Sequence, residues 1–268
     1  MVQFAGSARS RCAGYVMRRG FRIACWLLLA ALGGPLFAPA SAWAQARFVG
    51  VLKLVPDGCA ASGKCRLDEN FGFIDANGLG WEARKGLETD GASIPSWAQP
   101  FVGAPFDEAF IRAAVIHDHY CIRQVREWRV THRAFYEGLR ASGVPEGRAS
   151  LMYYAVLVGG PKWIELIPGA PCGTGGACIN QVDVSTQVRG SFIAMNDEGQ
   201  ALVRRPALYA TPGFSAAMER FQAEHAANPA GPTREQAEAA AARDMSGDFF
   251  FRNGRSIGTS LRVRIEVR

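Results

Sequence analysis

The sequence has little excess charge and, beyond its first 44 residues, no long hydrophobic run. Its 268 residues contain 30 basic and 24 acidic side chains. Residues 1–44 hold five arginines and no acidic residue, so the remainder carries 25 basic and 24 acidic residues. This near neutrality gives no indication of a nucleic-acid partner. The segment 21–38 is the one stretch apolar enough to consider for a bilayer, which excludes a polytopic membrane protein. The composition, 49% hydrophobic and 20% charged, is that of a globular protein.

The first 44 residues have the pattern of an export signal. Arginines precede an apolar run over residues 23–32, a Gly-Gly-Pro interruption follows, and the small residues 40–44 fit the Ala-x-Ala rule of signal peptidase. We expect cleavage after Ala44, or after Ala46, and a periplasmic or secreted protein with no transmembrane segment after cleavage. A membrane anchor is the alternative, but the apolar run is short for a span. The order Arg18-Arg19-Gly-Phe-Arg22 resembles a twin-arginine signal, so both export routes stay open.

Five cysteines remain after this cleavage, and four of them form two identical Cys-x5-Cys intervals. The intervals are Cys59 to Cys65 and Cys172 to Cys178. In an oxidising compartment each interval is predicted to close as a local disulfide. A zinc site is the alternative, but neither interval has the two-residue spacing of a zinc knuckle. Cross-pairing between the two intervals stays open. Cys121 is interpreted as a buried thiol on a helix.

The periodicity predicts an α+β fold, in which N-terminal antiparallel strands pack on a three-helix unit. Residues 47–55 are rich in β-forming side chains, and 71–75 followed by Asn77-Gly78 has the pattern of a hairpin. Apolar residues then recur at helical spacing between 107 and 128, and further helices are predicted over 130–141 and from Pro145 to residue 160. Strands followed by helices are typical of the α+β class.

The predicted organisation is a signal (1–44), a core domain (45–168) and a C-terminal extension of helices and a final strand (169–268). Within the extension, helices are predicted over 213–227 and 233–244, the second beginning with the capping-box order Thr233-x-x-Gln236. Residues 261–268 alternate strictly between apolar and polar side chains, which predicts a strand with one buried face. A place at the edge of the first sheet would explain this pattern.

Polar residues that interrupt the apolar pattern are the candidates for chemistry. They are the loop 89–95, with Asp90 and Ser93, the pair His117-Asp118, Tyr120 and His132. His117 lies on the apolar stripe of its helix, and His132 shares a helical face with apolar neighbours, so both rings are predicted to point inward. A buried Asp118 needs a cation, backbone donors or a metal. The alternatives to a functional site are a purely structural turn at residues 89–95 and buried histidines whose hydrogen bonds are made within the core. Two inward histidines and an aspartate on consecutive helices favour a shared polar pocket.

Several of these motifs occur together in one family. Thr89-Asp-Gly-Ala-Ser-Ile-Pro95, Ala113-Ala-Val-Ile-His-Asp118, Phe135 and Gly143-Val-Pro145 together resemble the domain of unknown function 1353, a small bacterial and phage family, over about residues 47–163. The resemblance implies a fold and a site location but no established activity. The family usually has His-Asp-Tyr-Leu-Tyr at residues 117–121, and Ala-Asp where this chain has Thr131-His132. Exchange of Asp for His favours a ligand or hydrogen-bonding pocket over a fixed ion pair, because both are metal ligands but they differ in charge.

Four hydrolase classes were compared with the pattern around His117. The order Ala113-Ala114-x-x-His117-Asp118 is similar to the helix of secreted phospholipases A2, in which the histidine is a base and the aspartate holds calcium, but the calcium loop of that family is missing. Metal-dependent His-Asp phosphohydrolases need a further upstream histidine, and His117 is the first in the chain. A Ser93-His117-Asp hydrolase lacks the Gly-x-Ser-x-Gly elbow. Cys121 as nucleophile is disfavoured, because a base and a nucleophile on one helix rarely reach attacking geometry.

Two hypotheses about function follow from the sequence. In the first, an exported metal-assisted hydrolase binds a divalent ion through Asp90, Asp118 and His132. His117 and Asp118 act in catalysis, with His117 as base or ligand, and Ser93 and Tyr120 orient substrate or water. Envelope polymers or lipids are the expected substrates. In the second, the protein is a non-enzymatic envelope module, whose polar residues form a network that fixes the loop onto the helices. Its cysteine-bearing loops and extension would then bind a polymer, lipid or protein partner.

Overall fold

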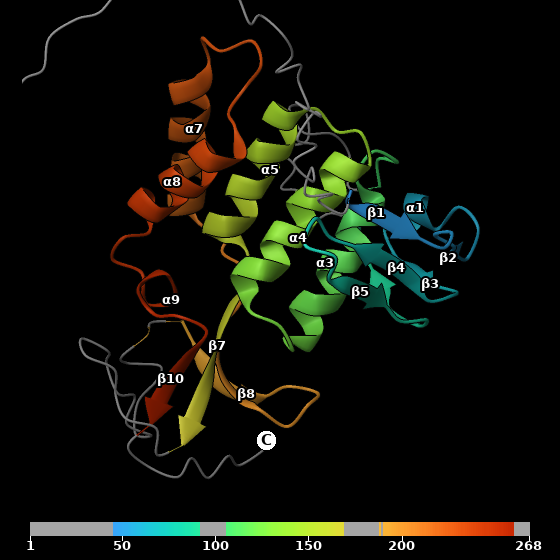
Figure 1. The fold of residues 1–268 in the computed structure, drawn as a ribbon, viewed down its shortest axis with the longest axis horizontal. Helices are drawn as coiled ribbons and strands as arrows, with labels where there is room; N and C mark the ends of the chain where they lie inside the picture. Colours follow the sequence, from blue (N-terminus) through green and yellow to red (C-terminus); the bar gives the residue numbers. More distant parts are fainter. Residues whose placement is uncertain (1–44, 92–105, 169–187, 189, 260–268) are drawn as a thin grey trace, which may run out of the picture. The chain divides into compact units, whose positions relative to one another are not determined.

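The computed structural model describes residues 45–91, 106–168, 188 and 190–259. The predicted signal, Ser93, the pair Cys172 and Cys178, and the alternating segment 261–268 lie outside the described residues. The α+β class is confirmed within them, as Figure 1 shows.

The N-terminal part forms two small antiparallel sheets, as the β-rich pattern predicted. One sheet has the order β1-β4-β5, and the other has the order β2-β3-β6. Their strands are β1 (Arg47–Val49), β2 (Leu54–Val55), β3 (Cys65–Leu67), β4 (Phe71–Ile74), β5 (Gly80–Ala83) and β6 (Glu88–Thr89). The predicted hairpin joins β4 to β5, and Gly78 adopts φ +81° in its turn. The Asp75 carboxylate fixes this turn, because it accepts hydrogen bonds from the backbone of Asn77 and Leu79 and from the Trp81 indole.

The predicted disulfide between Cys59 and Cys65 is present. Cys59 begins the short helix α1 (Cys59–Ser62) and Cys65 begins β3, with their Cα atoms 5.2 Å apart. The bond therefore closes a tight loop beside the second sheet.

Three helices follow in the order that the sequence predicted. They are α3 (Ile111–Arg123), α4 (Trp128–Ala141) and α5 (Glu146–Gly159). Pro145 precedes α5 as its N-cap residue. Helices α3 and α4 approach closely because small residues meet between them: a Cβ added at Gly138 would lie 2.9 Å from the Cβ of Ala113. This close approach brings the facing side chains of the two helices within hydrogen-bonding distance.

The C-terminal part contributes a second layer of helices and a four-stranded sheet in the order β10-β7-β9-β8, in which β10 runs parallel to β7. The elements are β7 (Lys162–Pro168), β8 (Phe192–Met195), β9 (Ala201–Arg205), α7 (Pro212–His225), α8 (Arg234–Asp244), α9 (Phe249–Arg252) and β10 (Ser256–Thr259). Both predicted helices are confirmed with small shifts of their ends. The capping box at Thr233 and Gln236 is formed.

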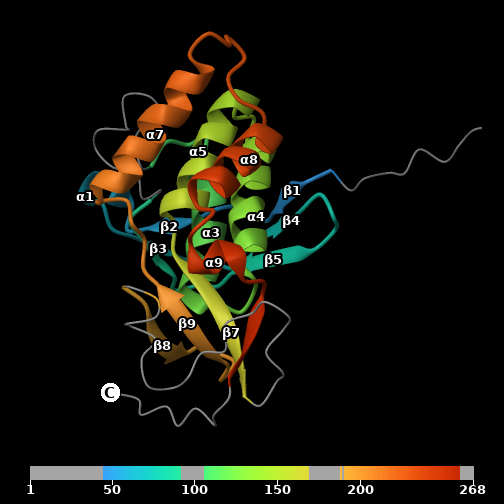
Figure 2. The same cartoon turned by 90° about the vertical axis from the view of Figure 1, so that its left-hand side faces the viewer.

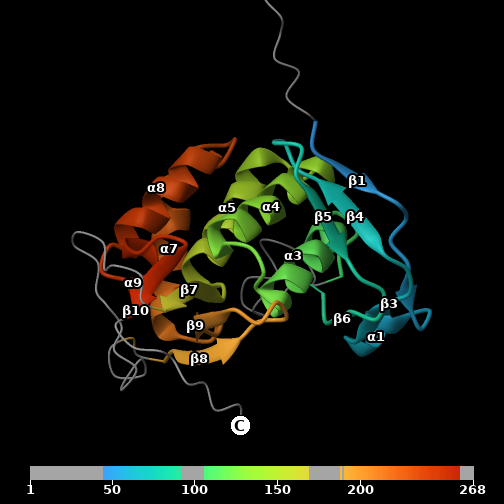
Figure 3. The same cartoon turned by 60° about the horizontal axis from the view of Figure 1, so that its bottom comes forward.

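The helices α3, α4 and α5 lie between the β1-β4-β5 sheet and the pair α7 and α8 (Figures 2 and 3). One apolar cluster runs from Phe110 in front of α3 to Ile257 in β10, so the core continues across residue 168. A second cluster joins the N-terminal sheets to α3. Among the described residues, no helix is long and apolar enough to cross a membrane.

Candidate metal centre and its cavity

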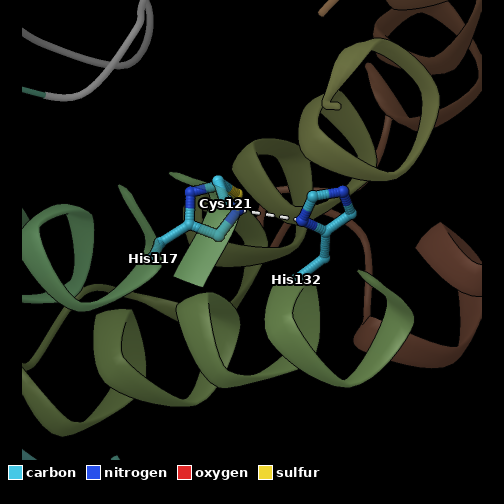
Figure 4. Close-up of side chains that lie close together, drawn as sticks. All are labelled: His117, Cys121 and His132. Carbon is cyan, nitrogen blue, oxygen red and sulfur yellow. Dashed lines mark hydrogen bonds between the residues drawn. The ribbon is translucent and has the colours of Figure 1, made fainter. Parts of the chain in front are cut away.

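His117 on α3 and His132 on α4 face each other in the interior, as the helical spacing predicted. The Nε2 atom of His117 lies 2.8 Å from Nδ1 of His132, and both residues are buried. Figure 4 shows the two imidazoles turned toward each other. One ring must donate and the other accept in this contact, so at least one of the two nitrogens has a lone pair available.

Cys121 lies beside the histidine pair. It follows His117 by one helical turn, and its Sγ atom is 3.4 Å from the same Nε2 atom. The thiol is free of disulfides. Burial raises its pKa well above the usual value, and the nearby Asp118 raises it further. The thiol is therefore protonated in the absence of a cation. The spacing of four residues on one helix thus brings the sulfur and the imidazole into contact.

The ligand atoms of His117, Cys121 and His132 all lie within 4.8 Å of one another. Zinc binds histidine nitrogen at about 2.0–2.1 Å and cysteine sulfur at about 2.3 Å, so tetrahedral neighbours are separated by roughly 3.3–3.6 Å. The distance from the Cys121 sulfur to the His117 nitrogen already lies in this range, and the two nitrogens need to separate by about half an ångström. The third pair, Cys121 and His132, is separated by up to 4.8 Å and needs to close by about 1.2 Å. The three side chains can hold one ion after a small adjustment.

Asp118 and Thr89 connect this cluster to strand β6. The Asp118 Oδ1 atom lies 3.8 Å from Nδ1 of His117, and Oδ2 accepts a hydrogen bond from the Thr89 hydroxyl. Burial raises the pKa of Asp118, and the charge of Asp90 raises it further. Metal-binding histidines usually donate their second ring N–H to a carboxylate or a backbone carbonyl. Asp118 lies on the side of His117 where such a partner belongs.

His132 is enclosed by rings and by the backbone that follows α5. The indoles of Trp128 and Trp163 contact its ring edge to face, and a Cβ added at Gly160 would lie 2.9 Å from its Nε2 atom. Burial lowers the pKa of His132 well below its usual value, and the charges of His117 and Lys162 act in the same direction. Its imidazole is therefore neutral at physiological pH, which is the form that binds metals.

A cavity of about 520 Å³ adjoins the cluster. His117, Asp118 and Cys121 line it on one side, and apolar residues of α5 and α7 line it on another. Its volume lies within the range of about 300–1,000 Å³ that is typical of ligand pockets. Asp90, which is exposed, also lines this cavity, while His132 stands behind the lining residues.

Tyr209 is a cavity residue that the sequence analysis missed. It lies in the connection between β9 and α7, and its ring contacts Phe214 at a centroid distance of 5.3 Å. Burial raises the pKa of Tyr209, and charges at Cys121 and Asp118, which line the same cavity, raise it further. A neutral phenol at this position is a hydrogen-bond donor.

Three of the predicted site residues lie together around the cluster, and Tyr120 does not. His117, Asp118 and His132 are joined by the contacts described above, while Asp90 stands at the cavity wall. Tyr120 points toward the first sheet, where its ring meets Trp81 and its hydroxyl accepts a hydrogen bond from the Glu82 backbone. Cys121 was predicted as a buried thiol but not as a ligand, although its spacing of four residues from His117 already placed both on one helical face.

Comparisons with known proteins identify relatives without assigned activity. Residues 65–156 match a family described as "Protein of unknown function (DUF1353)". The uncharacterized protein y4iH of Sinorhizobium fredii (strain NBRC 101917 / NGR234) is 52% identical over 113 residues, which cover 42% of this chain and 47% of the relative. The uncharacterized protein y4jT of the same strain is 46% identical over 97 residues, which cover 36% and 29%. The chain thus spans less than half the length of these relatives. No solved structure matches it.

The matched segment contains β3 to β6, α3, α4 and most of α5. It includes Thr89, His117, Asp118, Cys121 and His132, so all the polar groups of the cluster belong to it. The resemblance to the DUF1353 family is confirmed over residues 65–156, which match the model of that family.

Proposed function

We propose that this protein is an exported hydrolase that uses one divalent metal ion held by His117, Cys121 and His132. The observation that carries the proposal is the convergence of these three ligand atoms within 4.8 Å, beside a cavity that His117 and Cys121 line. Three protein ligands with a further position open to water are the usual arrangement of catalytic zinc sites. A bound ion supplies acidity to water at neutral pH.

The surrounding groups fit the needs of such a site. Asp118 is near the second nitrogen of His117, and the backbone of Gly160 and Pro161 lies against Nε2 of His132. Asp118 is thus a potential acceptor for the second ring nitrogen of His117, and such a partner fixes ring orientation in metal sites. Among the described residues, Nε2 of His132 has no hydrogen-bond partner. The Asp118 side chain is 21% exposed and lines the cavity, so it can also accept a proton from water. Cys121 replaces Asp90 and Asp118 as the proposed third ligand.

Export is proposed on separate grounds. The N-terminal sequence has the signal pattern, and the Cys59–Cys65 disulfide is of a kind that persists in oxidising compartments. Envelope polymers and lipids are the candidate substrates that this location would supply.

Metal analysis tests the centre directly. Protein purified without chelator should contain about one zinc or similar ion per chain. His117→Ala and His132→Ala should each lower metal affinity at least 10-fold, and His225→Ala, on the distant helix α7, serves as the matched control. With cobalt in place of the native ion, a thiolate charge-transfer band is expected in the near ultraviolet. Cys121→Ser should remove this band and leave the visible cobalt absorption.

Activity measurements separate the proposal from its alternatives. Cleavage of p-nitrophenyl butyrate should stop on chelation and return with the metal. Hydrolysis that resists chelation but is lost on alkylation of Cys121 would replace the metal centre with a cysteine–histidine pair, for which the 3.4 Å contact is the supporting observation. Absence of both bound metal and hydrolysis would favour the non-enzymatic module, in which Thr89, Asp118 and the histidines form a structural network.

A further inference from the structure

The mouth of the cavity carries exposed apolar side chains. Ile122 at the end of α3 and Phe192 on β8 both line the cavity, and they are 60% and 50% exposed. Single exposed apolar residues are common on protein surfaces. Two large ones at the opening of the same cavity extend its apolar lining outward, so an apolar group entering from solvent stays in contact with hydrocarbon.

Beside this opening, the Arg204 guanidinium lies over the Phe192 ring, 5.7 Å from its centroid, without an ion-pair partner among the described residues. Arg204 on β9 lies directly across from Phe192 in the sheet, and both residues line the cavity. Within the described part of the chain, the Arg204 guanidinium has no carboxylate within ion-pairing distance, and its buried Nε atom has no hydrogen-bond partner. The neighbouring Arg205, in contrast, is neutralised by Asp248. An anionic group at the mouth would give Arg204 the partner that it lacks.

The inner wall of the cavity is hydrocarbon. Met152 and Val156 of α5 and Phe214 and Met218 of α7 line it, and all four are buried. Exposure gives a direction along the cavity, because Ile122 and Phe192 are exposed while these wall residues are buried, and His117 and Cys121 line the same cavity. The lining therefore runs from an exposed side that carries a cation to a buried apolar wall, and it includes the polar cluster.

From this order we infer that the cavity binds an anionic amphiphilic acyl ester, with its acidic head group on Arg204 and its acyl chain against α5 and α7. The ester carbonyl then lies beside His117, Cys121 and Tyr209. Binding depends only on the cavity, whereas the statement that this ligand is a substrate rests on the proposed hydrolase function. A surface of anionic lipids is one source of such a ligand, and a dissolved single-chain ester is the other.

The reaction consumes one water molecule for each ester. The water oxygen bonds to the acyl carbon, the bond between that carbon and the alcohol oxygen breaks, and a proton from water passes by way of Asp118 to the alcohol oxygen. The products are a fatty acid and an alcohol that carries the acidic head group. Tyr209 lines the same cavity and is the proposed donor of a hydrogen bond to the carbonyl oxygen as that oxygen gains charge.

Calorimetric titration of chelator-treated protein with alkyl phosphates tests binding without the metal. Affinity should rise at least 10-fold from butyl to octyl and again from octyl to dodecyl phosphate below its micelle concentration, and inorganic phosphate should not bind measurably. Arg204→Gln should weaken dodecyl phosphate about 10–100-fold and leave dodecyl maltoside unchanged, because a charge-assisted hydrogen bond is lost. Arg243→Gln, which breaks an exposed pair with Glu224 and does not line the cavity, is the matched control.

Equal affinity for butyl, octyl and dodecyl phosphate would overturn this inference. An Arg204→Gln variant that binds dodecyl phosphate with the affinity of the wild type would also overturn it. The alkyl series uses the unaltered protein, so a misfolded variant cannot obscure it. Dodecyl phosphate binding without cleavage of dodecanoyl glycerol phosphate would retain the ligand class and refute the hydrolase. Cleavage of p-nitrophenyl butyrate by a protein that does not bind dodecyl phosphate would retain the hydrolase function and refute the ligand class. Faster cleavage in anionic vesicles than in solution would identify a lipid surface as the source.

Discussion

Gly160 provides the most direct test of how His132 is positioned. A methyl group at this residue would lie 2.4 Å from the carbonyl oxygen of Val156 and 2.9 Å from Nε2 of His132, whereas ordinary contact begins at 3.4 Å. The carbonyl would have to move by about 1.0 Å and the imidazole by about 0.5 Å. Gly160 has φ −69° and ψ 163°, which any residue can adopt. The whole effect of Gly160→Ala is therefore steric.

We expect Gly160→Ala to destabilise the fold by about 1–3 kcal/mol, the usual cost of overpacking a core. For a chain of this size each kcal/mol lowers Tm by about 2–4 °C. Displacement of His132 should also reduce metal affinity about 10–100-fold, as the loss of supporting contacts does in metal sites. Gly213→Ala is the control, because nothing lies within 4 Å of its added methyl group and α7 should gain stability.

Thermal unfolding and metal titration of both variants test separately how His132 is packed and whether it binds the ion. A Gly160→Ala protein with unchanged Tm would refute the packing described around His132. A lowered Tm with unchanged metal affinity would show that His132 supports the fold but does not bind the ion.

Three further predictions concern the rest of the fold. Replacing Cys59 and Cys65 by serine should cost about 2 kcal/mol, from the loop-closure entropy of a cross-link spanning a separation of 6 residues, and urea unfolding that shows no loss would contradict this. Burial raises the pKa of Glu137 above its usual 4.5 in the folded protein. The folded state is therefore favoured most below pH 4.5, where Glu137 is protonated, and it loses this stability as the pH rises through the raised pKa. Glu137→Gln should therefore become more stable relative to wild type between pH 4.5 and 7, and urea midpoints with a constant difference would argue against it. Thr233→Ala removes a capping box and should lower the free energy of unfolding by about 0.5–2 kcal/mol, with a thermal melt as the measurement.

The elements that the sequence predicted well are those governed by local rules. The β4–β5 hairpin follows from Asn77-Gly78, the start of α8 from its capping box, and the inward rings of His117 and His132 from helical spacing. Each of these depends on residues that are close in the chain. The location of the candidate site was predictable for the same reason.

The parts that were missed depend on contacts between distant segments. Tyr209 lies in a connection without periodic pattern, and it lines the cavity because the following helix α7 packs on α5. Arg204 and Phe192 come to the cavity through pairing of β8 with β9. Tyr120 was expected at the site because it is near Asp118 in sequence, but two helical residues turn the side chain by about 200°, toward the sheet.

The two halves of the cavity differ in their relation to the family. The polar cluster lies within residues 65–156, which match the family, whereas Phe192, Arg204, Tyr209, Phe214 and Met218 follow that segment in the chain. Metal binding would then depend on Cys121 and His132, where the family usually has Tyr and Asp, so the proposed ion site is particular to this chain. The length of chain and the head group accepted would depend on β8, β9 and α7, which follow the matched segment. Substitutions on α3 should therefore abolish turnover of short and long esters alike. Substitutions on β9 and α7 should change the preference among them, because they alter the wall and leave the ligands in place.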